Sequence, residues 1–294
     1  VGGRVVYDFE SGVPSGVNVY GNAVVDSGIL KITDAANGQN GAVLVTDVDS
    51  GLEVGQFVAT FDLRIGGSIC CDLDGVPRPA DGMSFNFADD LPEGTYGLVN
   101  TSGFDEGAEG GQGSGLILSF DLWDNGGADD APEMLLAYQN QMIARVPMGE
   151  PRTRDPVGEI PIDPANGEPM RLSTDHANWP PLPTDPTFAQ IMVKLDPDGT
   201  VDVSYKGVLL FDNVQTGYVP QRGEFGFGGR TGGANSAHWV DNLAIQTFGS
   251  LGPVSIAQDL SPAEQTVDEN TVVTYTVAAD GTPPYSVQWL RNGE

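Results

Sequence analysis

The segment Ser119–Asp130, SFDLWDNGGADD, combines an alternating strand pattern, a glycine-rich turn and four carboxylates. Asp121 ends the alternating run, and Asp124, Asp129 and Asp130 lie in or after the turn. Calcium takes about 6–8 oxygen ligands from carboxylates, amides, backbone carbonyls and water. The segment is therefore either a calcium site or a hairpin turn whose charges are solvated, and its spacing must be judged against the elements around it.

The chain as a whole is strongly acidic. It has 294 residues, with 41 Asp and Glu against 13 Lys and Arg, and a formal net charge of −28. Phosphate groups are bound by clustered Lys and Arg, so this balance argues against nucleic acid as a partner. It is typical of a secreted, extracellular or cell-surface protein. No run of about 18 apolar residues occurs, so we expect no membrane span.

Period-2 alternation predicts an all-β fold, and no convincing amphipathic helix is present. About eleven short strands separated by glycine-rich turns indicate an antiparallel β-sandwich. Between two of them, DPDGT at 196–200 is a hairpin turn, because Asp-Gly supplies the positive φ of a tight turn. The predicted strands are 4–10, 28–34, 41–46, 57–65, 82–88, 115–123, 134–139, 188–196, 200–214, 223–230 and 238–248.

Residues 147–187 interrupt the alternation with many prolines. An insertion of about 40 residues without alternation is uncommon inside a compact domain and often lines a functional surface. The alternative is a long loop that its prolines, Met170 and Trp179 pack over one sheet. The sequence leaves both open.

The pattern changes near FGSLGPV at 248–254, which predicts one domain over 1–250 and a second over 251–294. The alternating runs VVTYTVAA and YSVQWL resemble the opening strands of a bacterial immunoglobulin-like domain, with Trp289 as its core tryptophan. Only about 40 of the roughly 100 residues of such a domain are present. We expect either a longer modular protein or strands completed by a neighbouring molecule, because an open sheet edge favours self-association.

Three motifs together resemble the L-type (legume-like) lectins. They are ADGMSFNF at 80–87, SFDLWDNGGADD, and GEFGFGGRTGGANSAHWVDNLAI at 223–245. The resemblance covers residues 1–250. The L-type lectins belong to the wider concanavalin A-like superfamily of lectins and glucanases. It implies a concanavalin-like jelly-roll β-sandwich and a carbohydrate ligand, such as a glycan or cell-surface polysaccharide.

The resemblance also implies a calcium site. Its spacing selects Asp121, the carbonyl of Trp123, Asn125 and Asp130 as ligands, while Asp124 and Asp129 become turn and surface charges. The family's neighbouring transition metal needs a Glu two residues before the first Asp and a His five residues after the last. Ser119 and Leu135 stand at those positions. Neither ligates a transition metal well, so we expect Ca²⁺ and no manganese.

Sugar-binding residues follow from the same resemblance. Asp81 matches the family's sugar-binding aspartate, and Ala80–Asp81 matches its cis peptide. The alternative is that Asp81 only caps the turn into the strand at 82–88. The other candidates are the Asn125 amide, the glycine-rich loop 228–233 with Gly229 and Arg230, and Trp179 or Trp239 for stacking on a sugar face.

The two cysteines, Cys70 and Cys71, are adjacent in the sequence. They can bond to each other, to another chain or to a ligand. Neighbouring Cα atoms lie closer than a disulfide usually spans, so a vicinal disulfide would be strained. We expect such a bridge to position the Asp81 loop or to contact ligand. Zinc is disfavoured, because no Cys or His cluster accompanies the pair.

The sequence indicates a binding protein and not an enzyme. Glycosidases on this sandwich need two carboxylates about 5–10 Å apart, and no Glu-x-Asp-x-Glu run occurs. His176 and His238 have no G-x-S-x-G nucleophile motif beside them. We therefore predict a non-catalytic, lectin-like adhesion module. The alternative is a structural subunit of an extracellular filament or surface layer.

Overall fold

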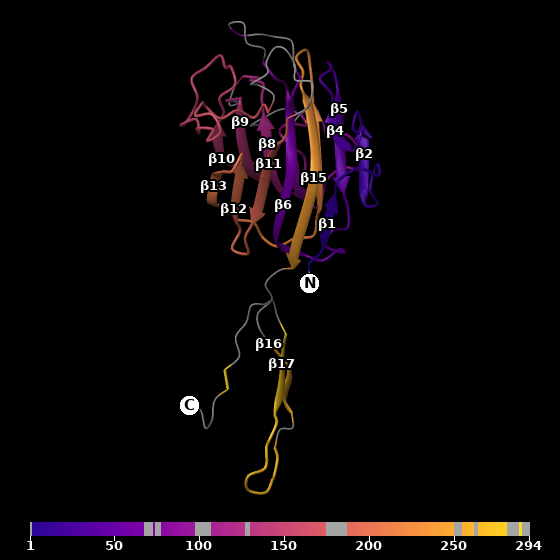
Figure 1. The fold of residues 1–294 in the computed structure, drawn as a ribbon, viewed down its shortest axis with the longest axis vertical. Coiled ribbons are helices and arrows are strands. Elements are labelled where there is room, and N and C mark those ends of the chain that lie inside the picture. The colour runs from indigo at the N-terminus through magenta and orange to yellow at the C-terminus, as the bar shows by residue number, and fades with distance from the viewer. Residues whose placement is uncertain are drawn as a thin grey trace.

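Two antiparallel sheets pack face to face in the computed structural model (Figure 1). The structure describes residues 2–67, 73, 78–97, 107–126, 130–174, 187–249, 255–261, 264–280 and 288–289. Within those ranges the chain forms no helix with the length and apolar character that a membrane span requires. The predicted all-β sandwich is confirmed.

The first sheet has eight strands in the described part of the chain. Their order is β13 (Val208–Gln215), β12 (Thr200–Tyr205), β11 (Ala189–Leu195), β6 (Val54–Gly66), β15 (Ala237–Gly249), β4 (Ile29–Thr33) and β3 (Val24–Asp26), with β1 (Arg4–Tyr7) also paired to β15. The long strands β6 and β15 form its centre and pair from Ala237↔Gly66 to Gly249↔Val54, with register shifts between Asp241 and Ala244 and between Phe248 and Gly249.

The second sheet has seven strands among the described residues and carries the candidate site. Their order is β10 (Gln141–Pro147), β9 (Glu133–Tyr138), β8 (Leu116–Asp121), β7 (Gly82–Ala88), β14 (Glu224–Arg230), β5 (Asn40–Val45) and β2 (Val17–Gly21). All three lectin-like motifs contribute a strand to its middle, β7, β8 and β14. They lie side by side although β14 follows β8 by more than 100 residues.

Each predicted strand segment contains a strand, but the segment 200–214 is two strands. Lys206 and Gly207 turn the chain between β12 and β13, with φ values of 51° and 76°. Two consecutive positive φ values match the twist of a two-residue hairpin. The continuous alternation hid this turn, because Lys-Gly is not among the usual hairpin dipeptides. The predicted turn at 196–200 is confirmed, with Gly199 N–H donating to Asp196 O at 3.0 Å.

The structure also contains β2, β3 and β10, which the sequence did not predict. β10 follows β9 through a two-residue turn, Gln139–Asn140, with φ values of 50° and 56°. Gln-Asn lacks the glycine that usually marks such a turn, so the sequence offered only a weak signal.

Aromatic side chains fill the centre of the core. Met83, Phe85 and Phe87 of β7 point between the sheets, and Phe85 and Phe87 pack against phenylalanines of β6 and β14. Ser84 and Asn86 alternate with them and face the outer side of the second sheet. The period-2 pattern therefore separates core from outer face within one strand.

Described residues from the segment between β7 and β8 pack on the outer face of the second sheet, over β7 and β14. The Tyr96 ring lies against Gly228, where a Cβ would come within 2.2 Å of it, and the Tyr96 hydroxyl lies over Gly226. Ser84 Oγ donates to Ala108 O at 2.7 Å. Gly226 and Gly228 thus alternate with the core residues Phe225 and Phe227 because they make room for Tyr96.

The proline-rich insertion is packed against the core over its described part, 147–174. Met148, Met170 and Leu172 are fully buried in the main core. Gly149 N–H donates to Met170 O at 2.7 Å, which ties both ends of this part together. The packing role predicted for Met170 is confirmed, whereas Trp179 lies outside the described residues.

A third sheet, of two strands, follows the sandwich and lies outside it in Figure 1. β16 (Ser255–Ser261) pairs antiparallel with β17 (Thr276–Asp280). Val272 is 90% exposed and Trp289 is 59% exposed. Two strands do not make an immunoglobulin-like sandwich, so that assignment and the boundary at 250 stay predictions.

Candidate functional site

The candidate site lies where β7 begins and where β8 and β14 end. Gly82 pairs with Asp121 on one side and with Arg230 on the other. Asp81, directly before β7, therefore lies between the ends of β8 and β14. Its N–H donates to Arg230 O at 3.1 Å, and its carbonyl accepts the Leu122 N–H at 2.9 Å. The Ala80–Asp81 peptide bond is cis, as the resemblance implied.

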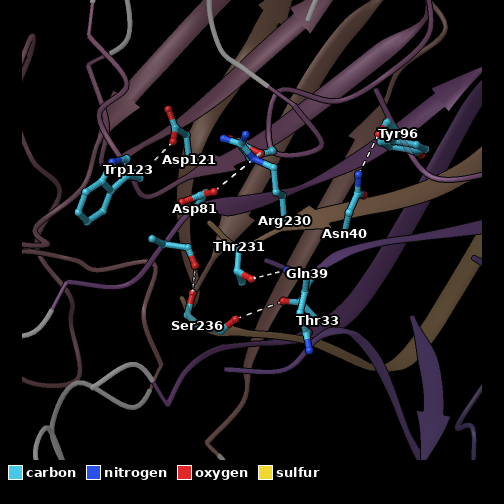
Figure 2. Close-up of polar contacts among 12 residues, drawn as sticks. Thr33, Gln39, Asn40, Asp81, Tyr96, Asp121, Trp123, Arg230, Thr231 and Ser236 are labelled. Carbon is cyan, nitrogen blue, oxygen red and sulfur yellow. Dashed lines mark hydrogen bonds and ion pairs between the residues drawn. The ribbon is translucent and has the colours of Figure 1, made fainter. Parts of the chain in front are cut away.

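Buried polar side chains support the peptide before Asp81, and Figure 2 shows one of their contacts, between Thr33 and Ser236. Ser236 Oγ donates to Ala80 O at 2.8 Å and contacts His238 Nε2 at 3.1 Å. His238 Nδ1 lies 2.7 Å from Thr33 Oγ1. Burial lowers the pKa of His238 to about 3, so its ring is neutral at neutral pH. His238 is thus a structural residue, buried between Ser236 and Thr33.

The Asp81 carboxylate faces a guanidinium group. Arg230 Nε lies 3.2 Å from Asp81 Oδ2, and the same group forms two hydrogen bonds with Glu109, of which the Nε–Oε2 bond is 3.0 Å long. Burial raises the pKa of Asp81, and Arg230 opposes that shift. Burial also raises the pKa of Glu109 to about 7, and the charge of Arg230 again opposes that shift. The site therefore holds two desolvated carboxylates around one guanidinium.

Glu109 was not found by sequence reasoning. It lies in the segment DEGAEGGQG, which has no periodicity and resembles an exposed acidic loop. The Glu109 side chain is nevertheless fully buried. Only the close approach of this segment to β14 reveals its role.

Gly229, predicted to lie in a sugar-binding loop, is part of a strand. It lies inside β14, paired with Met83 and with Gly41, and is buried. A Cβ there would come within 2.9 Å of Ile32 Cγ2, so the residue makes room for the core. Its backbone belongs to the sheet ladder, because β14 continues to Arg230 before the loop begins. In that loop, the Gly232 N–H hydrogen-bonds the Asp81 carboxylate.

The predicted calcium ligands lie on the loop after β8. Asp121 is buried, and one of its carboxylate oxygens accepts the Trp123 N–H at 3.2 Å. Asn125 is exposed. Asp130 forms an ion pair with Arg145 of β10. Arg145 Nε also lies 3.4 Å from Glu133 Oε2.

The donor types of this set suit calcium, because it offers two carboxylates, an amide and a carbonyl. Arg145 is the competitor, since it holds one carboxylate oxygen of Asp130. Among the residues that the structure describes, no group of three or more His, Cys, Asp or Glu side chains is arranged to hold a metal ion. Of the predicted ligands, only Asp121 and Asp130 are side chains of these types. The set fits the ion if Asp130 binds the ion and Arg145 at the same time.

Asp124 has the turn role predicted for it. Its Oδ1 accepts the Gly126 N–H at 2.8 Å, and its Oδ2 accepts Arg154 Nε at 2.8 Å. Burial alone would raise the pKa of Asp124, but the Arg154 and Gly126 hydrogen bonds lower it below its usual value. Asp129, the other predicted turn charge, lies outside the described residues.

Trp239, one of the two aromatic candidates for sugar stacking, is covered by two cations. Lys31 Nζ and the Arg64 guanidinium lie over the Trp239 ring, 4.6 and 4.1 Å from its centroid. These cations flank Trp239 in register on β4 and β6. Sugar stacking on Trp239 would have to displace them. Trp179, His176 and the cysteines Cys70 and Cys71 lie outside the described residues.

No protein-family model matches the chain, and no curated protein is similar to it in sequence. Solved structures do match. A lectin from Bauhinia forficata in complex with GalNAc has a TM-score of 0.54 and 15% identity, over 85% of this chain and 100% of that one. The Ca²⁺/Man3GlcNAc-bound exoplasmic/lumenal domain of VIP36 has a TM-score of 0.53 and 12% identity, over 85% and 90%. Basic winged bean lectin with Tn-antigen has a TM-score of 0.51 and 16% identity, over 83% and 98%. The structural similarity establishes the concanavalin A-like lectin fold. At identities of 12–16% it establishes nothing finer.

Proposed function

From the fold shared with these lectins, we propose that the chain is a secreted or cell-surface module that binds carbohydrate without catalysing a reaction. One observation carries the proposal. The Asp81 backbone is fixed by hydrogen bonds to Arg230 and to Leu122, and the Asp81 carboxylate is held by the Gly232 N–H and by Arg230. Such a carboxylate is a preorganised acceptor for sugar hydroxyls, each of which can both donate and accept.

Asp81 and Arg230 together present an acceptor beside a donor. Asp81 accepts a hydrogen bond from one sugar hydroxyl, and Arg230 donates to a neighbouring one. Asn125, exposed on the loop after β8, adds an amide, and Gly232 holds the Asp81 carboxylate from the opposite side. The ligand class that fits is a saccharide with adjacent hydroxyls.

Replacing Asp81 with asparagine is expected to weaken glycan binding at least about 100-fold, because hydrogen bonds to a charged group contribute about 1.5–3 kcal/mol each. A glycan array identifies the ligand, and isothermal titration calorimetry measures the loss. Asp212→Asn, an exposed acid on β13, is the matched control and should bind as the native chain does. Unchanged affinity in Asp81→Asn would rule out this site.

Calcium is proposed as the site's cofactor, held by Asp121, the Trp123 carbonyl, Asn125 and Asp130. When bound, the ion would link the end of β8 to the loop that follows it. The chain's own residues still orient Asp81, since the Ser236 and His238 chain reaches Ala80 from the other sheet.

Arg145→Gln is expected to raise calcium affinity about tenfold, because the guanidinium competes for Asp130 and repels a cation. Calcium titration calorimetry and the Trp-sensitised luminescence of Tb³⁺ measure it without any sugar. Asp130→Asn should lower the affinity in the same assay. An absence of saturable binding in both the native chain and Arg145→Gln would remove calcium from the proposal.

The alternative, a structural subunit of a filament or surface layer, is favoured by the separate β16–β17 sheet and by the exposed Val272 in the segment between its two strands. Electron microscopy of the purified chain distinguishes the two functions. Filaments, together with no binding on the glycan array, would replace the carbohydrate-binding proposal with this one.

A further inference from the structure

We propose that Glu109 is a positioning residue that makes the site select neutral sugars and reject anionic ones. It does so by holding the Arg230 guanidinium in a two-bond pair, which prevents Arg230 from acting as an anion receptor. This inference rests on the proposed function and specifies its ligand class.

The segment around Glu109 is anchored to the outer face of the second sheet. Ser119 Oγ donates to the Glu109 carbonyl at 2.5 Å, and Ser84 Oγ donates to the Ala108 carbonyl at 2.7 Å. Gln112 N–H donates to Asn86 Oδ1 at 3.0 Å. Three outward-facing side chains of β7 and β8 therefore fix the backbone that carries Glu109.

Two glycines allow this close approach. A Cβ at Gly82 would come within 2.9 Å of Glu109 Cβ, and a Cβ at Gly107 would come within 3.0 Å of Arg230 Nε. Gly107 also has a φ of +67°, a conformation that side chains other than glycine rarely adopt. The local sequence is thus built to place Glu109 against Arg230.

The geometry divides the guanidinium unequally between its two acids. Glu109 receives two hydrogen bonds, from Nε and from the second terminal nitrogen, in the forked geometry that Arg–carboxylate pairs favour. Asp81 has one contact, with Nε at 3.2 Å. The Glu109 side chain is 0% exposed and that of Arg230 is 17% exposed, so Glu109 anchors Arg230 from beneath.

The charges then decide the ligand. Among the side chains that the structure describes, the carboxylates of Asp81 and Glu109 face the single guanidinium of Arg230. An anionic sugar would meet this group of three side chains, which carries a net negative charge and whose cation is already engaged. Neutral hydroxyls meet an acceptor at Asp81 and a donor edge at Arg230, without any charge repulsion.

Paired neutral and anionic glycans test the inference. Glucose- and galactose-terminated glycans are compared with their glucuronic and galacturonic acid counterparts, by calorimetry at pH 8. The native chain should prefer the neutral member of each pair at least about tenfold. In Glu109→Gln that ratio should fall at least about tenfold, because one negative charge is lost and the guanidinium is released; a tenfold change corresponds to about 1.4 kcal/mol.

Glu159→Gln is the matched control, because it removes the same charge from an exposed position. Its selectivity should equal that of the native chain. Arg230→Gln is the second variant and should change the ratio in the opposite direction, towards stronger rejection of the anionic sugar. This variant keeps the test decisive if thermal unfolding shows that Glu109→Gln does not fold.

The outcomes separate the two proposals. Native binding with the same neutral-to-anionic ratio in Glu109→Gln overturns the role of Glu109 and leaves the carbohydrate function standing. The same holds if Arg230→Gln lowers the ratio. An absence of native binding to every glycan overturns the proposed function and this inference together.

Discussion

Replacing Phe85 with alanine is expected to lower the free energy of unfolding by about 3–5 kcal/mol, the usual cost of removing a buried phenylalanine. Phe85 is almost fully buried at the centre of the sandwich. Its ring centroid lies 5.6 Å from that of Phe61 on β6 and 5.4 Å from that of Phe227 on β14. The truncation therefore removes contacts to both sheets and leaves a cavity between them.

The effect should reach the candidate site, since Phe85 lies on β7 and Asp81 directly precedes that strand. Urea unfolding monitored by tryptophan fluorescence measures the loss. Leu209→Ala, on the edge strand β13 where the side chain is 48% exposed, is the control and should cost less than about 1 kcal/mol. A Phe85→Ala loss as small as that of the control would show that the core is not centred here.

Acid should destabilise the protein through His238. The pKa of His238 is lowered by burial from 6.5 to about 3. Below pH 6.5 the unfolded chain gains a proton that the folded chain does not, so the stabilising contribution is complete above pH 6.5 and is lost as the pH falls towards 3. The slope for one such group is about 1.4 kcal/mol per pH unit.

His238→Gln tests this, because glutamine does not titrate but can still hydrogen-bond Ser236 and Thr33. Urea unfolding of both proteins at pH 7, 5.5, 4 and 3 gives the difference in unfolding free energy. That difference should shrink as the pH falls. A difference independent of pH would mean that His238 titrates normally in the folded state.

Glu109 opposes His238 over part of this range. Burial raises the pKa of Glu109 from 4.5 to about 7, so the folded chain holds the extra proton between these values. Its contribution to stability therefore decreases as the pH rises through this window. The loss due to His238 is consequently clearest between pH 4.5 and 3, where Glu109 is protonated in both states.

The strands that carry the site were predictable, because burial on one face imposes a period of two on the sequence. β7, β8 and β14 all follow the predicted segments closely. Hairpin turns that lack a strong turn dipeptide were not predictable. Gln139–Asn140 and Lys206–Gly207 adopt positive φ in the absence of the Asn-Gly or Asp-Gly signal, and the strands beside them were missed or merged.

Alternation predicts the sandwich, and the resemblance of ADGMSFNF to the lectin motif implies the cis peptide at Ala80–Asp81, so both could be found before the structure. The packing of distant segments places Gly229 in a strand, Arg145 against Asp130, and Glu109 beneath Arg230. The Glu109–Arg230 contact, for example, joins residues 121 positions apart. No periodicity within one segment encodes such a pairing, because it depends on which side chains the packed sheets bring face to face. SFDLWDNGGADD was thus sufficient to indicate the fold, whereas the partners of its carboxylates come from β10 and from the loop that contains Arg154.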